Sequence, residues 1–301
     1  MLKQAVLRWW GITRDAVRLW FECNAFSYAG SLAFYTLFSL APVVIIAVSV
    51  IGLVLGEEAA QGQIVAQLQD IMGRDAAMAV EQAVVHSRIE ESGLLPTVLG
   101  LFALLVGATT VFSQMQFSLN TIWGVAARPD SNSMLQFLKS RLLSLAVVLS
   151  IGFVLLVSLL LGVTLRAALH FAHRFVPAVE ALLTGTEFVA TAVATALLFG
   201  AIFKMLPDVV LRWRDVIVGA AVTAALFSVG RYAIAAYLAY TATASAYGAA
   251  GSVVLILLWV YYSSLILLFG AAFTRAHLEA CGRTVRPRST AICVHRLLVE
   301  D

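Results

Sequence analysis

The chain has 301 residues, of which 61% are hydrophobic and only 12% are charged, and its formal net charge is +3. Water-soluble domains are typically about 45–50% apolar and about 25% charged, so this composition excludes an ordinary soluble protein and indicates an integral membrane protein. The apolar runs are long and continuous, as in membrane helices, whereas strands of a membrane barrel alternate apolar and polar residues. The basic residues are spread over loop ends, which predicts no nucleic-acid partner.

Residues 2–22 predict an amphipathic helix. At about 100° per residue, the charged side chains gather on one side, and Trp9, Trp10 and Trp20 take the other. A basic helix with tryptophans is typical of the membrane interface. Packing beneath the helix bundle is an alternative that is compatible with this position. The apolar run that begins near Tyr28 is too long for a signal peptide, so we expect it to stay as a span.

Six apolar segments are long enough to cross about 30 Å of hydrocarbon. We expect transmembrane helices at about residues 28–55, 95–125, 138–165, 187–206, 215–240 and 248–274. Pro42 lies inside the first span, where a lost backbone hydrogen bond predicts a hinge. The acidic residues 56–93 carry apolar positions at helical spacing, which predicts an outer helical segment. The expected architecture is all-α, with one polytopic membrane domain (residues 1–280) and a basic tail (residues 281–301).

The distribution of Lys and Arg predicts the orientation of the spans. Basic residues gather at the loops and termini on one side of the predicted membrane and are scarce on the other. Because cytoplasmic loops carry the excess of Lys and Arg, we expect both termini in the cytoplasm and residues 56–93 outside. Cys23, Cys281 and Cys293 would then lie on the reducing side as free thiols.

Arg231 is a charge inside the predicted fifth span, roughly 13 Å from its outer end at 1.5 Å per residue. An arginine at such depth costs a few kcal/mol unless it is paired or faces water, which makes it a candidate for substrate binding or gating. Glu187, at the outer start of the fourth span, is the nearest predicted carboxylate, and Trp259 could supply a cation–π contact. The alternative is an arginine that reaches outward or holds a structural ion pair.

Polar residues at spacings of three or four define two further candidate surfaces for substrate binding. The faces comprise Asn24, Tyr28, Ser31 and Tyr35 at the start of the first span, and Thr109, Ser113, Gln116 and Asn120 in the second. Both faces lie in the predicted cytoplasmic half and could line a water-filled cavity. The alternative is hydrogen bonding between helices in a dry bundle. Tyr261 and Tyr262, followed by two serines near the midplane of the sixth span, leave the same two interpretations open.

Small residues recur in the last two predicted spans, from Gly219 to Ala235 and from Gly248 to Ser252. Because small side chains let two backbones approach closely, this pattern predicts tight helix contacts. The sequence leaves open whether the protein forms a homo-oligomer.

Patterns typical of catalysis are absent from the sequence. The five histidines form no His-Glu-x-x-His or comparable ligand set, and Gly248–Gly251 lacks the Lys-Ser/Thr of a phosphate-binding loop. We therefore expect no enzymatic activity, no metal and no cofactor.

Several motifs resemble those of the YihY family, also called the virulence factor BrkB family. They are SLAFYTLFSLAP (31–42), GATT (107–110), LNTIWGV (119–125), LPD (206–208), WRD (213–215), GRY (230–232), AYGAAGS (246–252) and LWVYYSS (258–264). The resemblance spans about residues 5–280. Family members usually carry an acidic residue where this chain has Phe117, and a Glu where it has Ala272, so Arg231 has fewer potential partners here.

The resemblance implies a six-helix bacterial inner-membrane protein. Part of the family has carried the label ribonuclease BN, but nothing in this sequence indicates metal or RNA binding. Export of envelope lipid precursors and serum resistance have been proposed for members, which favours a transporter or flippase for an amphiphilic or anionic, envelope lipid-like substrate. The alternative is a non-catalytic structural or envelope-assembly protein that docks through its acidic outer segment.

Overall fold

The computed structural model describes residues 2–56, 94–128, 179–240 and 251–294, together with a few positions between 62 and 81. Within these residues the helices are α1 (Leu2–Glu22), α2 (Ala25–Leu55), α5 (Leu94–Trp123), α7 (Val179–Met205), α8 (Trp213–Tyr240) and α10 (Gly251–Ala280). Two short strands complete the described elements, β1 (Val125–Ala127) and β2 (Ala291–Cys293). The protein is mostly helical, as the sequence predicts.

The helices agree with five of the expected spans and with the N-terminal amphipathic helix. The described stretches Trp213–Ile234 and Val253–Ala280 are long and apolar enough to cross a membrane, and Thr191–Met205 is a shorter apolar stretch. The expected third span (138–165) and most of the expected outer segment lie outside the described residues. The six-span count therefore stays a prediction.

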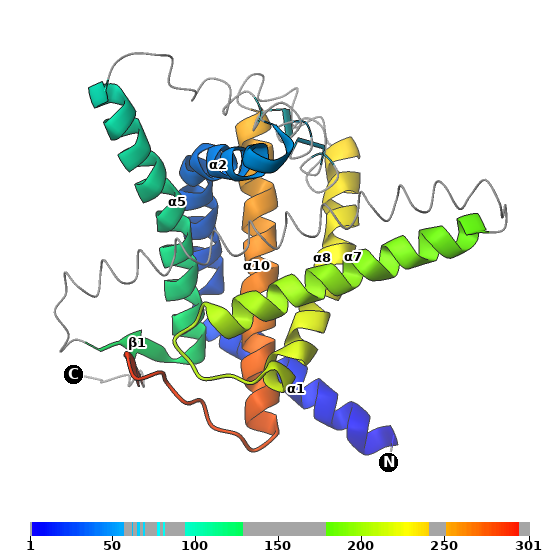
Figure 1. The fold of residues 1–301 in the computed structure, drawn as a ribbon. Coiled ribbons are helices and arrows are strands. Elements are labelled where there is room, and N and C mark those ends of the chain that lie inside the picture. The colour runs from blue at the N-terminus through cyan, green and yellow to red at the C-terminus, as the bar shows by residue number, and fades with distance from the viewer. Residues whose placement is uncertain are drawn as a thin grey trace.

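A tight turn joins α1 to α2. Asn24 has a φ of 53°, a left-handed conformation that asparagine tolerates better than most residues. Its carbonyl accepts hydrogen bonds from the N–H groups of Ser27 (3.0 Å) and Tyr28 (3.2 Å), which start α2. Pro42 lies near the middle of α2, and Figure 1 shows that this helix changes direction along its length. A proline kink accounts for such a bend, because the ring removes a backbone donor.

Helix α10 is the central element of the structure. It packs against α1, α2, α5 and α8, and Figure 1 shows it between α2 and α5 on one side and α8 on the other. Helix α7 packs against α8 and crosses the view at a large angle to α10. Helix α1 lies along the last turns of α10, where Trp9 stacks on Phe273 and on His277. The inner face of α1 thus packs beneath the helix bundle, as one of the two sequence-based interpretations expected. Trp10, on the same helix, stays exposed.

Helices α8 and α10 approach each other through a reciprocal pair of glycines and threonines. A Cβ placed on Gly219 of α8 would overlap Thr274 of α10, and one placed on Gly270 of α10 would overlap Thr223 of α8. Each threonine donates its hydroxyl to the carbonyl of the glycine four residues earlier in its own helix, at 2.6 Å in both cases. The two helices therefore run antiparallel in a fixed register. Each threonine hydroxyl forms its hydrogen bond within its own helix and not across the contact. This confirms the close contact expected at Gly219.

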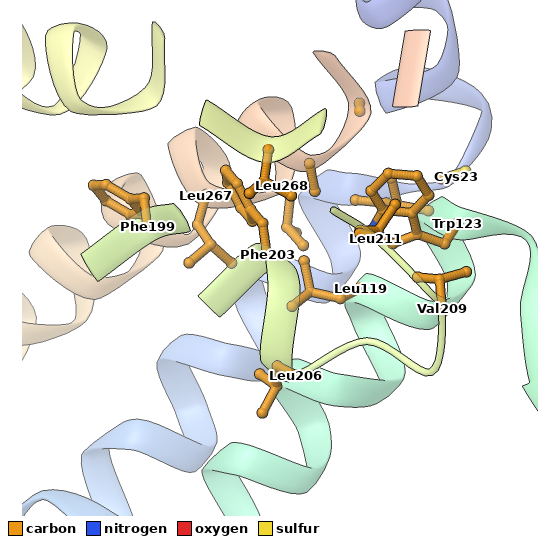
Figure 2. Close-up of a cluster of buried hydrophobic side chains, with 14 of the residues drawn as sticks. Cys23, Leu119, Trp123, Phe199, Phe203, Leu206, Val209, Leu211, Leu267 and Leu268 are labelled. Carbon is orange, nitrogen blue, oxygen red and sulfur yellow. The ribbon is translucent and has the colours of Figure 1, made fainter. Parts of the chain in front are cut away.

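The main hydrophobic core lies at the end of α10 that also carries its C-terminus. Figure 2 shows Phe203 of α7 between Leu119 of α5 and Leu268 of α10, with Phe199 further along α7. Trp123, at the end of α5, packs beside Leu211 and Val209 of the segment that joins α7 to α8. The largest fully buried side chains belong to this cluster and include Trp123, Phe203, Leu119, Ile122, Leu268 and Val209.

The sequence did not predict the two short strands. Strands β1 and β2 pair antiparallel, with Ala126 opposite Ile292. Residues 281–294 therefore fold back against the end of α5, where the sequence suggested only a basic tail. Three residues are too few to show a periodicity, and their partners are far apart in the chain, so no local pattern could reveal this pairing.

The α8–α10 contact generates a stability prediction. Gly219→Ala and Gly270→Ala should each destabilise the protein by about 1–3 kcal/mol, because the added methyl group has no space and the helices must move apart. The measurement is the melting temperature of the detergent-solubilised protein. Gly30→Ala in α2 is the matched control, since a Cβ there meets no heavy atom within 4 Å. Equal melting temperatures for Gly219→Ala and Gly30→Ala would contradict the register described here.

Candidate functional site

Asp208 is the centre of a hydrogen-bonded cluster between α5, the α7–α8 connection and the C-terminal segment. Its Oδ2 accepts hydrogen bonds from Asn120 Nδ2 (2.8 Å) and Gln116 Nε2 (3.1 Å), and its backbone N–H donates to Asn120 Oδ1 (2.8 Å). Its carbonyl accepts the N–H of Arg288 at 2.9 Å. We call Gln116, Asn120, Asp208 and Arg288 the Asp208 junction. Because Asn120 is buried, these bonds satisfy polar groups that burial would otherwise destabilise.

The C-terminal segment extends this junction on the other side of the loop. The Arg288 guanidinium donates to the carbonyls of Lys204 and Met205, both at 3.3 Å, at the end of α7. A cation at this position satisfies the free carbonyls of the last helical turn and interacts favourably with the helix dipole. The Val210 N–H donates to the carbonyl of Arg286 at 2.9 Å, next to an isolated bridge between Val209 and Pro287. Residues 286–288 thus hold the α7–α8 connection along its length.

Asp215 forms a second link between the same segments. It lies in the first turn of α8 and its Oδ2 accepts the Arg212 N–H at 2.9 Å, as the third residue of a capped helix does. Its Oδ1 pairs with the guanidinium of Arg283. The Asp215 side chain is only 7% exposed whereas that of Arg283 is 54% exposed. The arginine therefore neutralises a buried carboxylate, whose loss of partner would be costly.

Arg275 of α10 holds the C-terminal end of α5. One guanidinium nitrogen donates to the carbonyl of Ile122 at 2.6 Å, and Nε pairs with Glu279 at 2.8 Å. Gly124 follows with a φ of 65°, the left-handed position at which glycine commonly ends a helix. A Cβ there would lie 3.2 Å from the Arg275 guanidinium, so glycine also provides room for the arginine.

The two predicted polar faces have different surroundings. On α5, Gln116 and Asn120 bind Asp208, while Thr109 and Ser113 donate to the carbonyls of Val106 (3.2 Å) and Thr109 (3.0 Å). The structure therefore brings the last two residues of this face together with a loop, a partner that the sequence analysis did not assign to them. The prediction of a cavity stays a prediction.

On α2, the predicted face is partly used for packing. Asn24 forms the turn before the helix, and the Tyr28 ring packs edge-on against Phe117 at 5.8 Å. Ser31 donates to the carbonyl of Ser27 at 3.1 Å, and Tyr35 is exposed beside Phe34. Phe117 therefore takes part in an aromatic contact between α2 and α5.

Arg231 is half-buried on α8. Its guanidinium lies 5.3 Å from the centroid of the Tyr232 ring, and within the described part of the chain no carboxylate lies within ion-pair distance of it. The side chain of Glu187 lies outside the described residues. The neighbouring Gly230 contacts Tyr262 of α10 so closely that a Cβ would overlap the phenol ring. This contact fixes the position of Arg231 relative to α10.

The other candidate residues of α10 are placed around the same contact. Trp259 is buried and packs edge-on against Phe227 at 5.9 Å, and the ring that lies beside Arg231 is that of Tyr232. Tyr261 is half-buried against the core, and Ala272 is fully buried. The Ser263 hydroxyl is buried without a hydrogen-bond partner among the described residues.

No group of three His, Cys, Asp or Glu side chains that could hold a metal ion occurs within the described ranges. The described polar groups are the charge pairs of Asp215 and Arg275, the amide donors that bind Asp208, and the Arg231 cation, all of which are suited to binding and positioning.

The sequence analysis missed Asp208 and Asp215 as organising residues. Signals for both exist in the chain. Asp208 follows a proline that ends a helix, and Asp215 is the acidic residue in the first turn of the next helix, where carboxylates favour the N-terminus. Their partners, Asn120 and Arg283, are distant in sequence, so the pairs themselves could not be predicted.

A family model described as virulence factor BrkB matches residues 18–291. The chain belongs to this family. The match covers the Asp208 junction, the Asp215–Arg283 pair and Arg231, so all three lie within the family's shared region.

Several similar proteins carry the name UPF0761 membrane protein. A UPF0761 membrane protein of Nitrosospira multiformis is 30% identical over 253 residues, covering 83% of this chain and 57% of the relative. Relatives from Alkalilimnicola ehrlichii and Chromobacterium violaceum are 29% and 28% identical and are covered over 54% and 64% of their lengths. The chain thus spans less than two thirds of these relatives. No solved structure matches it.

The Asp208 junction generates a double-mutant prediction. Asp208→Ala and Asn120→Ala should each lower the melting temperature, and the double variant should lose less than the sum, with a coupling of about 1–3 kcal/mol, because the Asn120 amide donates to the Asp208 carboxylate and either substitution removes this bond. Thermal unfolding in detergent measures all three. Asp15→Ala serves as the control, since its pair with Arg14 is exposed and contributes little. Additive losses would show that Asp208 and Asn120 act independently.

Proposed function

We propose that the protein is an inner-membrane transporter or flippase for an amphiphilic, anionic, envelope lipid-like substrate. The observation that carries the proposal is Arg231. Among the described residues, Arg275 and Arg283 pair with carboxylates, whereas Arg231 lies in an apolar helix with only an aromatic ring as its nearest recorded partner. A charge in such surroundings is costly unless it is paired or faces water, and the anionic head of a substrate would supply the missing partner.

The proposal includes six spans with both termini in the cytoplasm. It is supported by the excess of Lys and Arg at the predicted cytoplasmic loops and by the position of α1 and residues 281–294 at the same end of the molecule (Figure 1).

A reporter enzyme that is active only in the periplasm should stay inactive when it is fused after Arg128.

A structural or envelope-assembly role is the second candidate. The observation in its favour is that Gln116 and Asn120 serve the Asp208 junction, because residues used for internal hydrogen bonds contribute less to a wet cavity. A protein of this kind would move no substrate.

The test uses purified protein in liposomes with NBD-labelled phosphatidylglycerol, an anionic lipid, in the inner leaflet. Wild-type protein should bring the label to the outer leaflet, where dithionite quenches it, faster than protein-free liposomes do. Zwitterionic NBD-labelled phosphatidylcholine should move more slowly. Movement of neither lipid would favour the assembly role.

Variants of Arg231 separate binding from folding. Arg231→Met should lower the rate for phosphatidylglycerol about tenfold or more, because a hydrogen bond to a charged group contributes about 1.5–3 kcal/mol. Arg231→Lys should keep part of the rate, since it retains the charge but loses the planar donor pattern. Arg214→Met, at an exposed site in the same helix, is the matched control. Equal losses of folded protein in Arg231→Met and Glu187→Gln would instead indicate a structural ion pair.

A further inference from the structure

Cys281 lies in a cluster that none of the roles discussed above uses. It follows Ala280, the last residue of α10, and is exposed. The Arg8 guanidinium of α1 donates a hydrogen bond to Cys281 Sγ at 3.3 Å, and His277 Nε2 lies 4.0 Å from the same sulfur. A nucleophilic sulfur, a cation and an imidazole therefore meet where α1 packs on α10.

We propose that Cys281 is a site of reversible modification by anionic low-molecular-weight disulfides. The thiolate is the reactive form of cysteine, and reactive cysteines lie in exposed surroundings beside Arg, Lys or His. Arg8 supplies a positive charge in direct contact with the sulfur. A neutral His277 imidazole can accept the thiol proton after a small side-chain movement.

The main opposing effect is the C-terminal end of α10, whose free carbonyls disfavour a negative charge. Several of these carbonyls are occupied: Cys281 N–H donates to His277 (3.1 Å), Gly282 N–H to Glu279 (2.9 Å) and Arg283 N–H to Leu278 (3.2 Å). The Glu279 carboxylate is itself paired with Arg275. Among the described residues, Arg8 is therefore the charged group that contacts the sulfur directly.

The reaction is a thiol–disulfide exchange. The Cys281 thiolate attacks one sulfur of the reagent disulfide, a new S–S bond forms and the reagent S–S bond breaks. The released thiolate takes up the proton held by His277. Cys281 is oxidised and one reagent sulfur is reduced, so no further oxidant is needed. A second arginine, Arg283, lies two residues from Cys281, so a negatively charged reagent is favoured over a positively charged one.

The other two cysteines provide internal controls. Cys23 is buried, while Cys293 is exposed on β2, where no arginine or histidine among the described residues contacts it. The experiment treats the whole protein in detergent with oxidised glutathione and follows each thiol by peptide mass spectrometry. Cys281 should react about fivefold faster than Cys293, because the nearby positive charges of Arg8 and Arg283 attract the anionic reagent. After denaturation in SDS, the two rates should become similar.

Two comparisons test the proposed cause. Arg8→Gln should lower the rate at Cys281 towards that of Cys293 and leave Cys293 unchanged, while continued protection of the buried Cys23 shows that the variant is folded. Cystamine, a positively charged disulfide, should show a smaller preference for Cys281 than oxidised glutathione does. Equal rates at Cys281 and Cys293 in the wild-type protein, an unchanged rate in Arg8→Gln, or a stronger preference with cystamine would each overturn the proposal.

Discussion

The close contact between α8 and α10 constrains the rest of the structure. Gly219 of α8 packs against Thr274 of α10, and Gly270 of α10 packs against Thr223 of α8. Neither helix can therefore slide or rotate without a steric overlap. In a membrane, where apolar side chains gain little by leaving lipid, close backbone packing of this kind is a main source of helix association. The same register sets Gly230 against Tyr262 and thereby fixes Arg231 beside α10. Because α10 also packs against α1, α2 and α5, and meets Phe203 of α7 beside Gly270, its position is transmitted to every described helix.

The Asp208 junction and the Asp215–Arg283 pair add a second constraint at the end of the bundle. They connect the α7–α8 segment, the end of α5 and residues 281–294 by hydrogen bonds that join residues far apart in the chain. Hydrophobic packing around Trp123 and Phe203 surrounds the same segments (Figure 2). The α8–α10 contact depends on steric fit between glycines and threonines, whereas the Asp208 junction and the Asp215–Arg283 pair depend on hydrogen-bonded polar groups. Substitutions that add volume therefore test the first, and substitutions that remove polar groups test the second.

Sequence patterns predicted the helices well and the long-range pairs poorly. The apolar runs located α2, α5, α7, α8 and α10 to within a few residues at most ends, since a span of fixed length leaves a strong local signal. Small residues indicated the close contact at Gly219. The spacing of Gln116 and Asn120 correctly placed them on one face, but it could not reveal that their partner is Asp208. Strand β2 was missed for the same reason, because its partner, residues 125–127, is far away in the sequence.

The most direct measurement is disulfide trapping across α8 and α10 in a variant that lacks the three native cysteines. A Cβ at position 270 lies 3.0 Å from Thr223 Cβ; disulfides join Cβ atoms about 3.5–4.5 Å apart, so only a slight separation is required. Cysteines at 223 and 270 should therefore cross-link rapidly under mild oxidation. A pair at 223 and 263, displaced by about 10 Å along α10, should not. Efficient cross-linking of the displaced pair, with none between 223 and 270, would contradict the register that positions Arg231.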